Sequence, residues 1–277
     1  MSQAELLEVE PVEIDAFIGA VRARWGYDFS EYSRPSFRRR VLRAVEREGL
    51  DSISELQGRV LRDRHALERF IGHASVGFTS MFRDPEFYRA FREEVVPQLR
   101  TWPFLRIWHA GCSTGEEVYS LAILLEEEGL YDRCRIYATD VSQVLVDQAR
   151  TGVFPLRVMK GYTQQYLASG GKRAFSSWYQ ADDRSAVFDP RLRRNVVFSV
   201  HNLVSDGVFN QFHVVLCRNV LIYFSPPLRD RVHTLLHASV ERFGYLGVGT
   251  KETVAHTPVA DHYEELAGDV RLYRKLS

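Results

Sequence analysis

Residues 107–117 read Ile107-Trp108-His109-Ala110-Gly111-Cys112-Ser113-Thr114-Gly115-Glu116-Glu117. A short apolar run ends at the first glycine, and a helix is expected after the second. Glycine allows tight turns and a close approach of the backbone to a ligand. This order of strand, glycine loop and helix is typical of a nucleotide-type site at the carboxyl edge of a parallel sheet. The two carboxylates would repel a pyrophosphate, so the pattern favours a ligand with ammonium and hydroxyl donors, such as S-adenosylmethionine.

Polar residues also follow the strands that are expected further along the chain. The strand after the glycine loop ends at Asp140, where an acid can accept both hydrogen bonds of a ribose diol. Another strand ends before Asn202 and Leu203, which suit an adenine, and a later one before Arg218 and Asn219. Because the carboxyl ends of parallel strands lie at one edge of a sheet, we expect these residues to surround the glycine loop.

Strands and helices alternate after residue 101, which predicts a parallel α/β sheet. The expected strands are 105–109, 135–139, 195–200, 213–217, 245–248 and 270–276, and the expected helices are 116–127, 142–150 and 226–240. Residues 151–194 interrupt the alternation with many turn formers. Short antiparallel strands are expected there at 175–179 and 186–188, so we predict a small β subdomain inserted into the α/β domain.

The first hundred residues are expected to be helical. The expected helices are 12–24, 35–48, 52–61, 65–73 and 86–99. Pro35 and Pro85 stand where helices begin, and Gly49 stands where one ends. The predicted organisation is an all-α domain over 1–100 and an α/β domain over 101–277, with the insert at about 151–194.

The composition is that of a globular protein. The 277 residues carry no net charge, with 36 Lys and Arg against 36 Asp and Glu, and an apolar fraction of 45% excludes disorder along the whole chain. No apolar run reaches the roughly 18 residues of a membrane helix, so no membrane insertion is expected. The three cysteines form neither a disulfide framework nor a metal-binding spacing. We therefore expect a cytoplasmic protein without a metal site.

One segment departs from the charge balance. Residues 22–47 hold eight Arg against three acids. Arg39, Arg43 and Arg47 lie one turn apart on one face of the expected helix, opposite its apolar positions. Such a face is either simply solvated or a docking surface. It favours an acidic protein partner over nucleic acid, which usually raises the pI of the whole domain.

Three motifs point to a known family. They are Ser113-Thr114-Gly115-Glu116-Glu117 followed by Tyr119 and Ser120, then Cys217-Arg218-Asn219-Val220 followed by Ile222-Tyr223-Phe224, and, at the expected domain junction, Thr79 with Phe82-Arg83-Asp84. With these motifs in this chain, the sequence from about Trp25 to its C-terminus resembles the chemoreceptor glutamate methyltransferases, the CheR family.

The resemblance implies both a fold and a reaction. The implied fold is a Rossmann-like S-adenosylmethionine-dependent methyltransferase domain with a small antiparallel β subdomain, preceded by an all-α domain. The implied reaction is methyl transfer to glutamate side chains of chemoreceptors, which forms methyl esters in chemosensory adaptation. We expect a monomer whose partners are the cytoplasmic methylation helices of chemoreceptors and other chemosensory proteins.

The resemblance also implies roles for individual residues. The cofactor would be bound by Thr79, Arg83, Glu117, Asp140, Asn202, Leu203, Arg218 and Asn219. Arg83 and Tyr223 would border the reacting methyl group as the catalytic residues. The row of Arg39, Arg43 and Arg47 would dock the receptor helices.

A catalytically weak homologue, which binds the cofactor and regulates a partner, is an alternative. Two departures from the family pattern favour it. Gly77 stands where the family usually has Asn, and residues 249–252 read Gly-Thr-Lys-Glu where many members have Gly-His-Ser-Glu.

A serine hydrolase is a second alternative, because residues 111–115 match the Gly-x-Ser-x-Gly pattern of a nucleophile elbow. Its candidate triad partners downstream are Asp189, Asp206, His256 and His262. Against this interpretation, the elbow normally follows several strands, whereas only helices are expected before Leu105.

Overall fold

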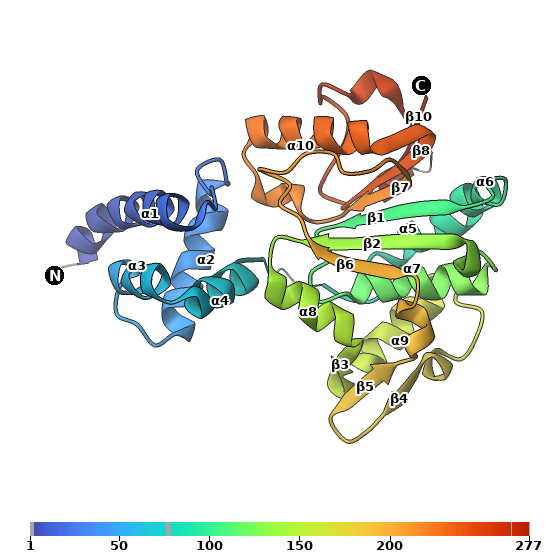
Figure 1. Ribbon diagram of the computed structural model, residues 1–277, viewed down its shortest axis with the longest axis horizontal. Coiled ribbons are helices and arrows are strands. Elements are labelled where there is room, and N and C mark those ends of the chain that lie inside the picture. The colour runs from blue at the N-terminus through green and yellow to red at the C-terminus, as the bar shows by residue number, and fades with distance from the viewer. Residues whose placement is uncertain (1–2, 76–78, 267, 277) are drawn as a thin grey trace. The chain divides into compact units, whose positions relative to one another are not determined.

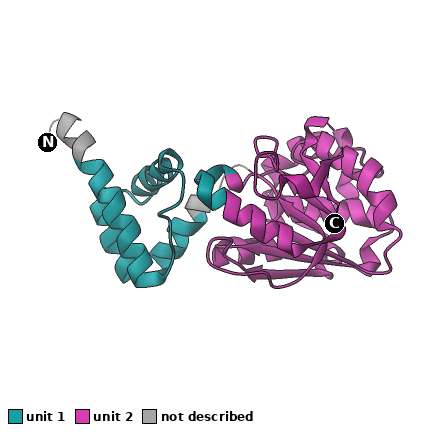
Figure 2. Ribbon diagram, turned by 90° about the horizontal axis from the view of Figure 1, so that it is seen from above, with its two compact units in different colours: residues 1–77, 222–229 teal, residues 78–221, 230–277 magenta. Residues whose placement is uncertain are grey.

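The computed structural model describes residues 3–75, 79–266 and 268–276. The chain divides into two compact units, residues 1–77 with 222–229, and residues 78–221 with 230–277 (Figure 2). The short segment 222–229 therefore belongs to the helical first unit, although it lies within the predicted α/β region.

The second unit begins earlier than the boundary that was expected at residue 100. In place of one helix over 86–99, the chain forms α5 (Pro85–Ala90), a π-helical turn η1 (Phe91–Val95) and α6 (Val96–Leu99). Phe87 and Phe91 from this segment are buried in the hydrophobic core of the second unit. Helical spacing predicts that one face of a helix is buried, but it does not say which neighbour covers that face. Residues 85–99 were therefore predicted to belong to the all-α domain together with the preceding helices.

The described part of the first unit is helical, as predicted. Its helices are α1 (Gln3–Trp25), α2 (Arg34–Arg47), α3 (Ile53–Arg62) and α4 (Arg64–Ser75). The Ser52 hydroxyl caps α3 by accepting a hydrogen bond from the Glu55 N–H at 3.2 Å. The ring centroids of Phe17 and Phe70 lie 4.9 Å apart in the core of this unit. Across the described residues, no helix is both long and apolar enough to span a membrane.

The second unit contains a seven-stranded sheet in the order β6-β2-β1-β7-β8-β10-β9 (Figure 1). Its strands are β1 (Leu105–Ala110), β2 (Cys134–Asp140), β6 (Val196–Val200), β7 (Phe212–Cys217), β8 (Val240–Val248), β9 (Tyr263–Glu265) and β10 (Leu272–Lys275). The first five strands are parallel, as predicted, but β10 pairs antiparallel with β8 and with β9. The described residues between β8 and β10 form only β9 and short 3₁₀ turns, so no helix carries the chain back to start another parallel strand.

The parallel strands bring the predicted ligand-binding residues to one edge. Helix α7 (Glu116–Glu127) follows β1 with the predicted bounds, while α8 (Gln143–Thr151) follows β2 and α10 (Pro226–Ser239) precedes β8. Asp140 pairs with Val200 at the ends of β2 and β6. The carboxyl ends of β1, β2, β6 and β7 therefore place the glycine loop and the residues after each strand at the same edge of the sheet.

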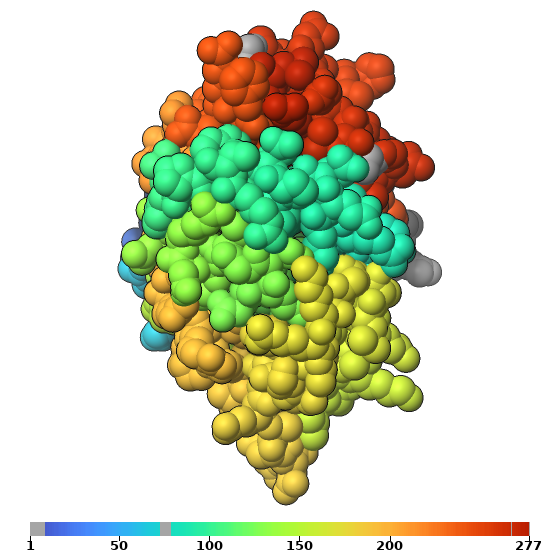
Figure 3. Space-filling model, turned by 90° about the vertical axis from the view of Figure 1, so that its right-hand side faces the viewer, coloured from blue at the N-terminus to red at the C-terminus, as the bar shows by residue number. Residues whose placement is uncertain are grey.

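The insert forms a separate antiparallel sheet in the order β3-β5-β4, as predicted (Figure 1). Its elements are β3 (Val153–Pro155), α9 (Met159–Ala168), β4 (Tyr179–Ala181) and β5 (Ser185–Phe188). The strand expected at 175–179 is wrong, because Phe175–Trp178 form a 3₁₀ turn that buries both of its aromatic rings. In Figure 3 the insert, coloured yellow, lies side by side with the green segment that includes the C-terminal end of α7.

Candidate active site

The glycine loop between β1 and α7 is held by the end of β2. The backbone N–H groups of Gly111 and Cys112 both donate to the Thr139 carbonyl oxygen at 2.8 Å. Gly111 and Gly115 have φ angles of 81° and 97°, in the region that only glycine adopts readily. A Cβ atom at position 111 would also lie 2.5 Å from the side chain of Val220, so glycine is required there for space as well.

Asp140 ends β2 directly beside this loop. Its carboxylate accepts the backbone N–H of Ser113 at 2.9 Å and that of Ser142 at 3.1 Å. Burial raises the pKa of Asp140, and the hydrogen bonds from Ser142 and Ser113 offset only part of that increase. A carboxylate has about four acceptor sites, so two N–H donors leave capacity for further hydroxyl donors. This donor and acceptor set fits a ribose diol.

Arg218, directly after β7, contacts two of the other predicted site residues, Glu117 and Arg83. Its guanidinium donates to the carboxylates of Glu117 and of Asp84, the latter at 2.7 Å, and to the Arg83 carbonyl oxygen at 3.1 Å. The Tyr88 hydroxyl donates to Glu117 at 3.3 Å. Burial lowers the pKa of Arg218, but the interactions with Glu117, Tyr88 and Asp84 together raise that pKa above its ordinary value. Several donors of Arg218 thus bind protein acceptors, which orients Glu117 and the Arg83 backbone.

Asn219 follows Arg218 in a strained backbone conformation, with φ of 60°. Its N–H donates to Glu252 Oε2 at 2.8 Å, and the Gly249 N–H donates to the same oxygen at 2.6 Å. The Asn219 side-chain oxygen is buried and has no hydrogen-bond partner among the described residues. In the sequence, residues 249–252 stand out only as a departure from the family pattern, so the role of Glu252 in holding Asn219 was not predicted.

Asn202 and Leu203 follow β6 at the same edge. The Asn202 side-chain oxygen accepts the Val204 N–H at 3.0 Å, and the preceding residue, His201, donates its N–H to the Asp140 carbonyl oxygen at 3.1 Å. Asn202 and Leu203 are therefore placed next to Asp140, as the prediction requires.

Thr79, the predicted cofactor residue at the domain junction, is half-buried. The departure at Gly77 lies outside the described residues.

Tyr223 belongs to the first unit, where it lies next to α2. Its backbone carbonyl oxygen accepts the Ser33 N–H at 2.9 Å, and the guanidinium carbon of Arg40 lies 3.6 Å from its ring centroid. Burial lowers the pKa of Arg40. Arg40 was not predicted as a site residue, although its position three residues after buried Phe37 places it on the inner face of α2. The predicted docking residues Arg39, Arg43 and Arg47 are all exposed.

The hydrolase interpretation gains no support from the loop. The Ser113 hydroxyl is buried and has no hydrogen-bond partner among the described residues, so no histidine activates it there. The described residues also contain no group of three or more His, Cys, Asp or Glu side chains arranged to hold a metal ion.

Comparisons with known proteins agree with this geometry. Residues 77–268 match the family model described as "CheR methyltransferase, SAM binding domain", and residues 12–73 match "CheR methyltransferase, all-alpha domain". A Pseudomonas putida protein named as the methyltransferase Cher3 is 43% identical over 95% of this chain and 97% of its own. Chemotaxis protein methyltransferase 1 of Pseudomonas aeruginosa is 31% identical over 81% of this chain and 83% of its own.

The fold and the site thus define an S-adenosylmethionine-dependent methyltransferase. The chain belongs to the CheR methyltransferase family. The predictions of family, fold class and cofactor are confirmed, and the hydrolase alternative is not supported. The residues present fit the cofactor, because Asp140 keeps acceptor capacity beside a glycine loop and Asn219 offers a side-chain oxygen without a partner.

Proposed function

We propose that this chain methylates glutamate side chains of chemoreceptors in the cytoplasm, forming methyl esters. Its relatives from Pseudomonas and Listeria are named chemotaxis protein methyltransferases. The observation that carries the choice of acceptor is the exposed row of Arg39, Arg43 and Arg47 on α2. A row of cations one helical turn apart complements a helix that presents several glutamates.

The residues at the sheet edge would hold the cofactor in distinct ways. Asp140 would accept hydrogen bonds from the ribose hydroxyls, and Glu117 would accept from the amino group. Asn202 and Leu203 would contact the adenine, while Thr79, Arg83, Arg218 and Asn219 would complete the site. When bound, S-adenosylmethionine supplies an activated methyl group.

The acceptor explains why the site needs no general base. A glutamate has a pKa near 4.3 and is therefore ionised, and nucleophilic, at neutral pH. What remains for the protein is to place the acceptor in line, an effect worth up to roughly 7–11 kcal/mol. Arg83 would orient the acceptor carboxylate and Tyr223 would position it through its hydroxyl. Arg40, stacked on the Tyr223 ring, would fix the ring plane.

The direct test is methylation of a cognate receptor with radiolabelled cofactor, read as methanol released by mild alkali, because methyl esters are alkali-labile and methylamines are not. We expect alkali-labile label on the receptor and none with Asp140→Ala. Charge reversal at Arg39, Arg43 and Arg47 should raise KM for the receptor and leave the affinity for S-adenosylhomocysteine unchanged. Cofactor binding without methylation of any receptor from the same organism would instead favour the regulatory homologue.

A further inference from the structure

The insert contacts both ends of α7 through its helix α9. Near the start of α7, the Tyr162 hydroxyl donates to Glu116 Oε1 at 3.3 Å. Near the end of α7, the Tyr166 hydroxyl donates to Glu127. These two tyrosines stand one helical turn apart on α9, so a single face of the insert lies along the helix that begins at the cofactor loop.

Glu116 receives neutral donors at its two oxygens. The Thr114 hydroxyl donates to Oε2 at 2.5 Å, while Tyr162 donates to Oε1. Burial raises the pKa of Glu116, the hydrogen bonds from Thr114 and Tyr162 lower it, and the adjacent charge of Glu117 raises it. The thiol of Cys112 in the glycine loop also lies close enough to Glu116 for the charge of Glu116 to raise the pKa of that thiol.

These contacts fix the glycine loop between two buried carboxylates. The Ser113 N–H donates to Asp140, and the next residue, Thr114, donates through its hydroxyl to Glu116. Glu116 in turn depends on Tyr162 for the donor on its other oxygen. The conformation of a loop from the main sheet is therefore connected to a side chain of the insert.

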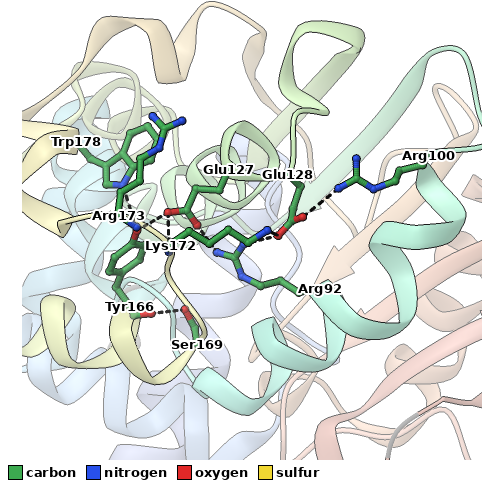
Figure 4. Close-up of polar contacts among 9 residues, drawn as sticks. All are labelled: Arg92, Arg100, Glu127, Glu128, Tyr166, Ser169, Lys172, Arg173 and Trp178. Atoms are coloured by element: carbon green, nitrogen blue, oxygen red, sulfur yellow. Dashed lines mark hydrogen bonds and ion pairs between the residues drawn. The ribbon is translucent and has the colours of Figure 1, made fainter.

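The other end of α9 is firmly attached. Glu127 also accepts the Lys172 N–H at 3.0 Å and an Arg92 guanidinium nitrogen at 2.5 Å, as Figure 4 shows. Arg92 binds Glu128 at 2.7 Å as well, and the side chains of Arg92 and Glu127 are 8% and 0% exposed. We call Arg92, Glu127, Glu128 and Lys172 the clamp. It holds the insert against α7 and so limits how far Tyr162 can move from Glu116.

We propose that Tyr162 is a positioning residue for the cofactor, which acts through Glu116 and Thr114 to keep the 111–115 loop in its binding conformation. The inference rests on the assignment of the cofactor to this loop. It gives the inserted subdomain a part in cofactor affinity, in addition to any part that it has in binding partners.

The test is calorimetric titration with S-adenosylhomocysteine between pH 5 and pH 8. At pH 7, Tyr162→Phe should weaken binding by about three- to tenfold, the effect of one hydrogen bond. Loss of the donor raises the pKa of Glu116 further, so the fall in affinity on acidification should begin at a higher pH than in the wild type. Glu116→Gln cannot titrate at this position, so in that background Tyr162→Phe should no longer shift the acid-dependent fall, while the part of the fall that comes from Asp140 remains. Tyr179→Phe, another tyrosine of the insert, is the matched control and should follow the wild-type curve.

The possible outcomes distinguish a failure of the positioning role of Tyr162 from a failure of the cofactor site. A Tyr162→Phe curve that coincides with the wild type, or that is weaker by the same factor at every pH, overturns the positioning role. Thr114→Val interrupts the same connection from the loop side, and it should shift the acid-dependent fall in the same direction. A wild-type protein that does not bind S-adenosylhomocysteine would instead overturn the cofactor site itself, and the inference with it.

Discussion

The two ends of α7 carry the same residue type in different surroundings. Glu116 and Glu117 begin the helix, and Glu127 and Glu128 end it. At the first end, Glu116 is bonded by hydroxyl groups and Glu117 by Arg218 and Tyr88. At the second end, the carboxylates are bonded by the side chains of Arg92, Arg100 and Lys172.

The helix dipole gives a physical reason for this difference. Carboxylates are stabilised at the N-terminus of a helix and destabilised at its C-terminus. Glu127 and Glu128 lie buried at the unfavourable end, where ion pairs with Arg92, Arg100 and Lys172 stabilise them. Glu116 and Glu117 lie at the favourable end, so the first end of α7 can keep acceptor capacity for a ligand. The cations around a buried carboxylate therefore help to distinguish a structural clamp from a binding site.

The largest effect should follow from removing the central cation of the clamp. Arg92→Leu leaves two buried carboxylates without their shared partner, which should cost about 3–5 kcal/mol of unfolding free energy. Urea denaturation followed by circular dichroism measures it. Arg100→Ala is the control, because this side chain is 51% exposed and its loss should cost at most about 1 kcal/mol. Similar losses in the two variants would contradict the clamp.

At the opposite end, the expected effect is on binding. Glu117→Gln should weaken the affinity for S-adenosylhomocysteine by about 10- to 150-fold, because a charged acceptor contributes roughly 1.5–3 kcal/mol. Calorimetry measures this change. Glu126→Gln, on the same helix, should bind like the wild type. If Glu117→Gln also binds like the wild type, Glu117 serves only to hold Arg218, and the two ends of α7 do not differ in function.

Glu252 lies at the same edge of the sheet as Glu117, and a substitution there tests whether every carboxylate at this edge contacts the cofactor. Its Oε2 already accepts two backbone N–H groups, from Asn219 and Gly249. Glu252→Gln keeps an acceptor but loses the charge, so we expect about 1 kcal/mol of destabilisation and only a few-fold loss of cofactor affinity. Thermal denaturation and calorimetry measure the two effects, with Lys251→Ala, an exposed neighbour, as control. A loss of affinity as large as that of Glu117→Gln would show direct contact with the ligand.

The start of α7 was predictable from the sequence because its signals are local. The glycines, the helix bounds over 116–127 and the position of Asp140 at a strand end all lie within a few residues of each other or follow from strand parallelism. The resemblance to the family then predicted the cofactor and the other residues that would bind it. The structure brings Arg83, Glu117 and Arg218 together as expected.

The end of α7 was not predictable, because its partners are distant in sequence. Arg92 precedes Glu127 by 35 residues, and Tyr166 follows it by 39. No spacing rule connects such residues, and a run of acids at a helix end is normally assumed to be solvated. Arg40 was not predicted for a different reason. It follows the exposed Arg39 directly in a run of arginines, and residue type alone does not distinguish a half-buried arginine from exposed ones.

The smallest effect concerns how stability depends on pH at the two ends of α7. Burial raises the pKa of Glu128, but the hydrogen bonds from Lys172 and Arg92 and the charges of these two residues together leave that pKa below its ordinary value of 4.5. The stabilisation from Glu128 is therefore complete above that pH and is lost as the pH falls. Burial raises the pKa of Glu116, so its contribution has the opposite sign. It is complete below the ordinary pKa and is lost as the pH rises through the folded value.

Glu116→Gln isolates the second of these contributions. At pH 4 the wild-type carboxyl is largely protonated and resembles the amide, so the two proteins should have similar unfolding free energies. As the pH rises through the folded pKa, the wild type has to ionise a buried carboxyl, whereas the variant does not, and the variant should gain up to about 1 kcal/mol relative to it. Urea denaturation across this range measures the difference. A difference that stays constant, or that favours the wild type as the pH rises, would mean that Thr114 and Tyr162 stabilise the ionised carboxylate more than burial opposes it. The N-terminal end of α7 would then be as fully satisfied as the clamp, and the contrast between the two ends would not hold.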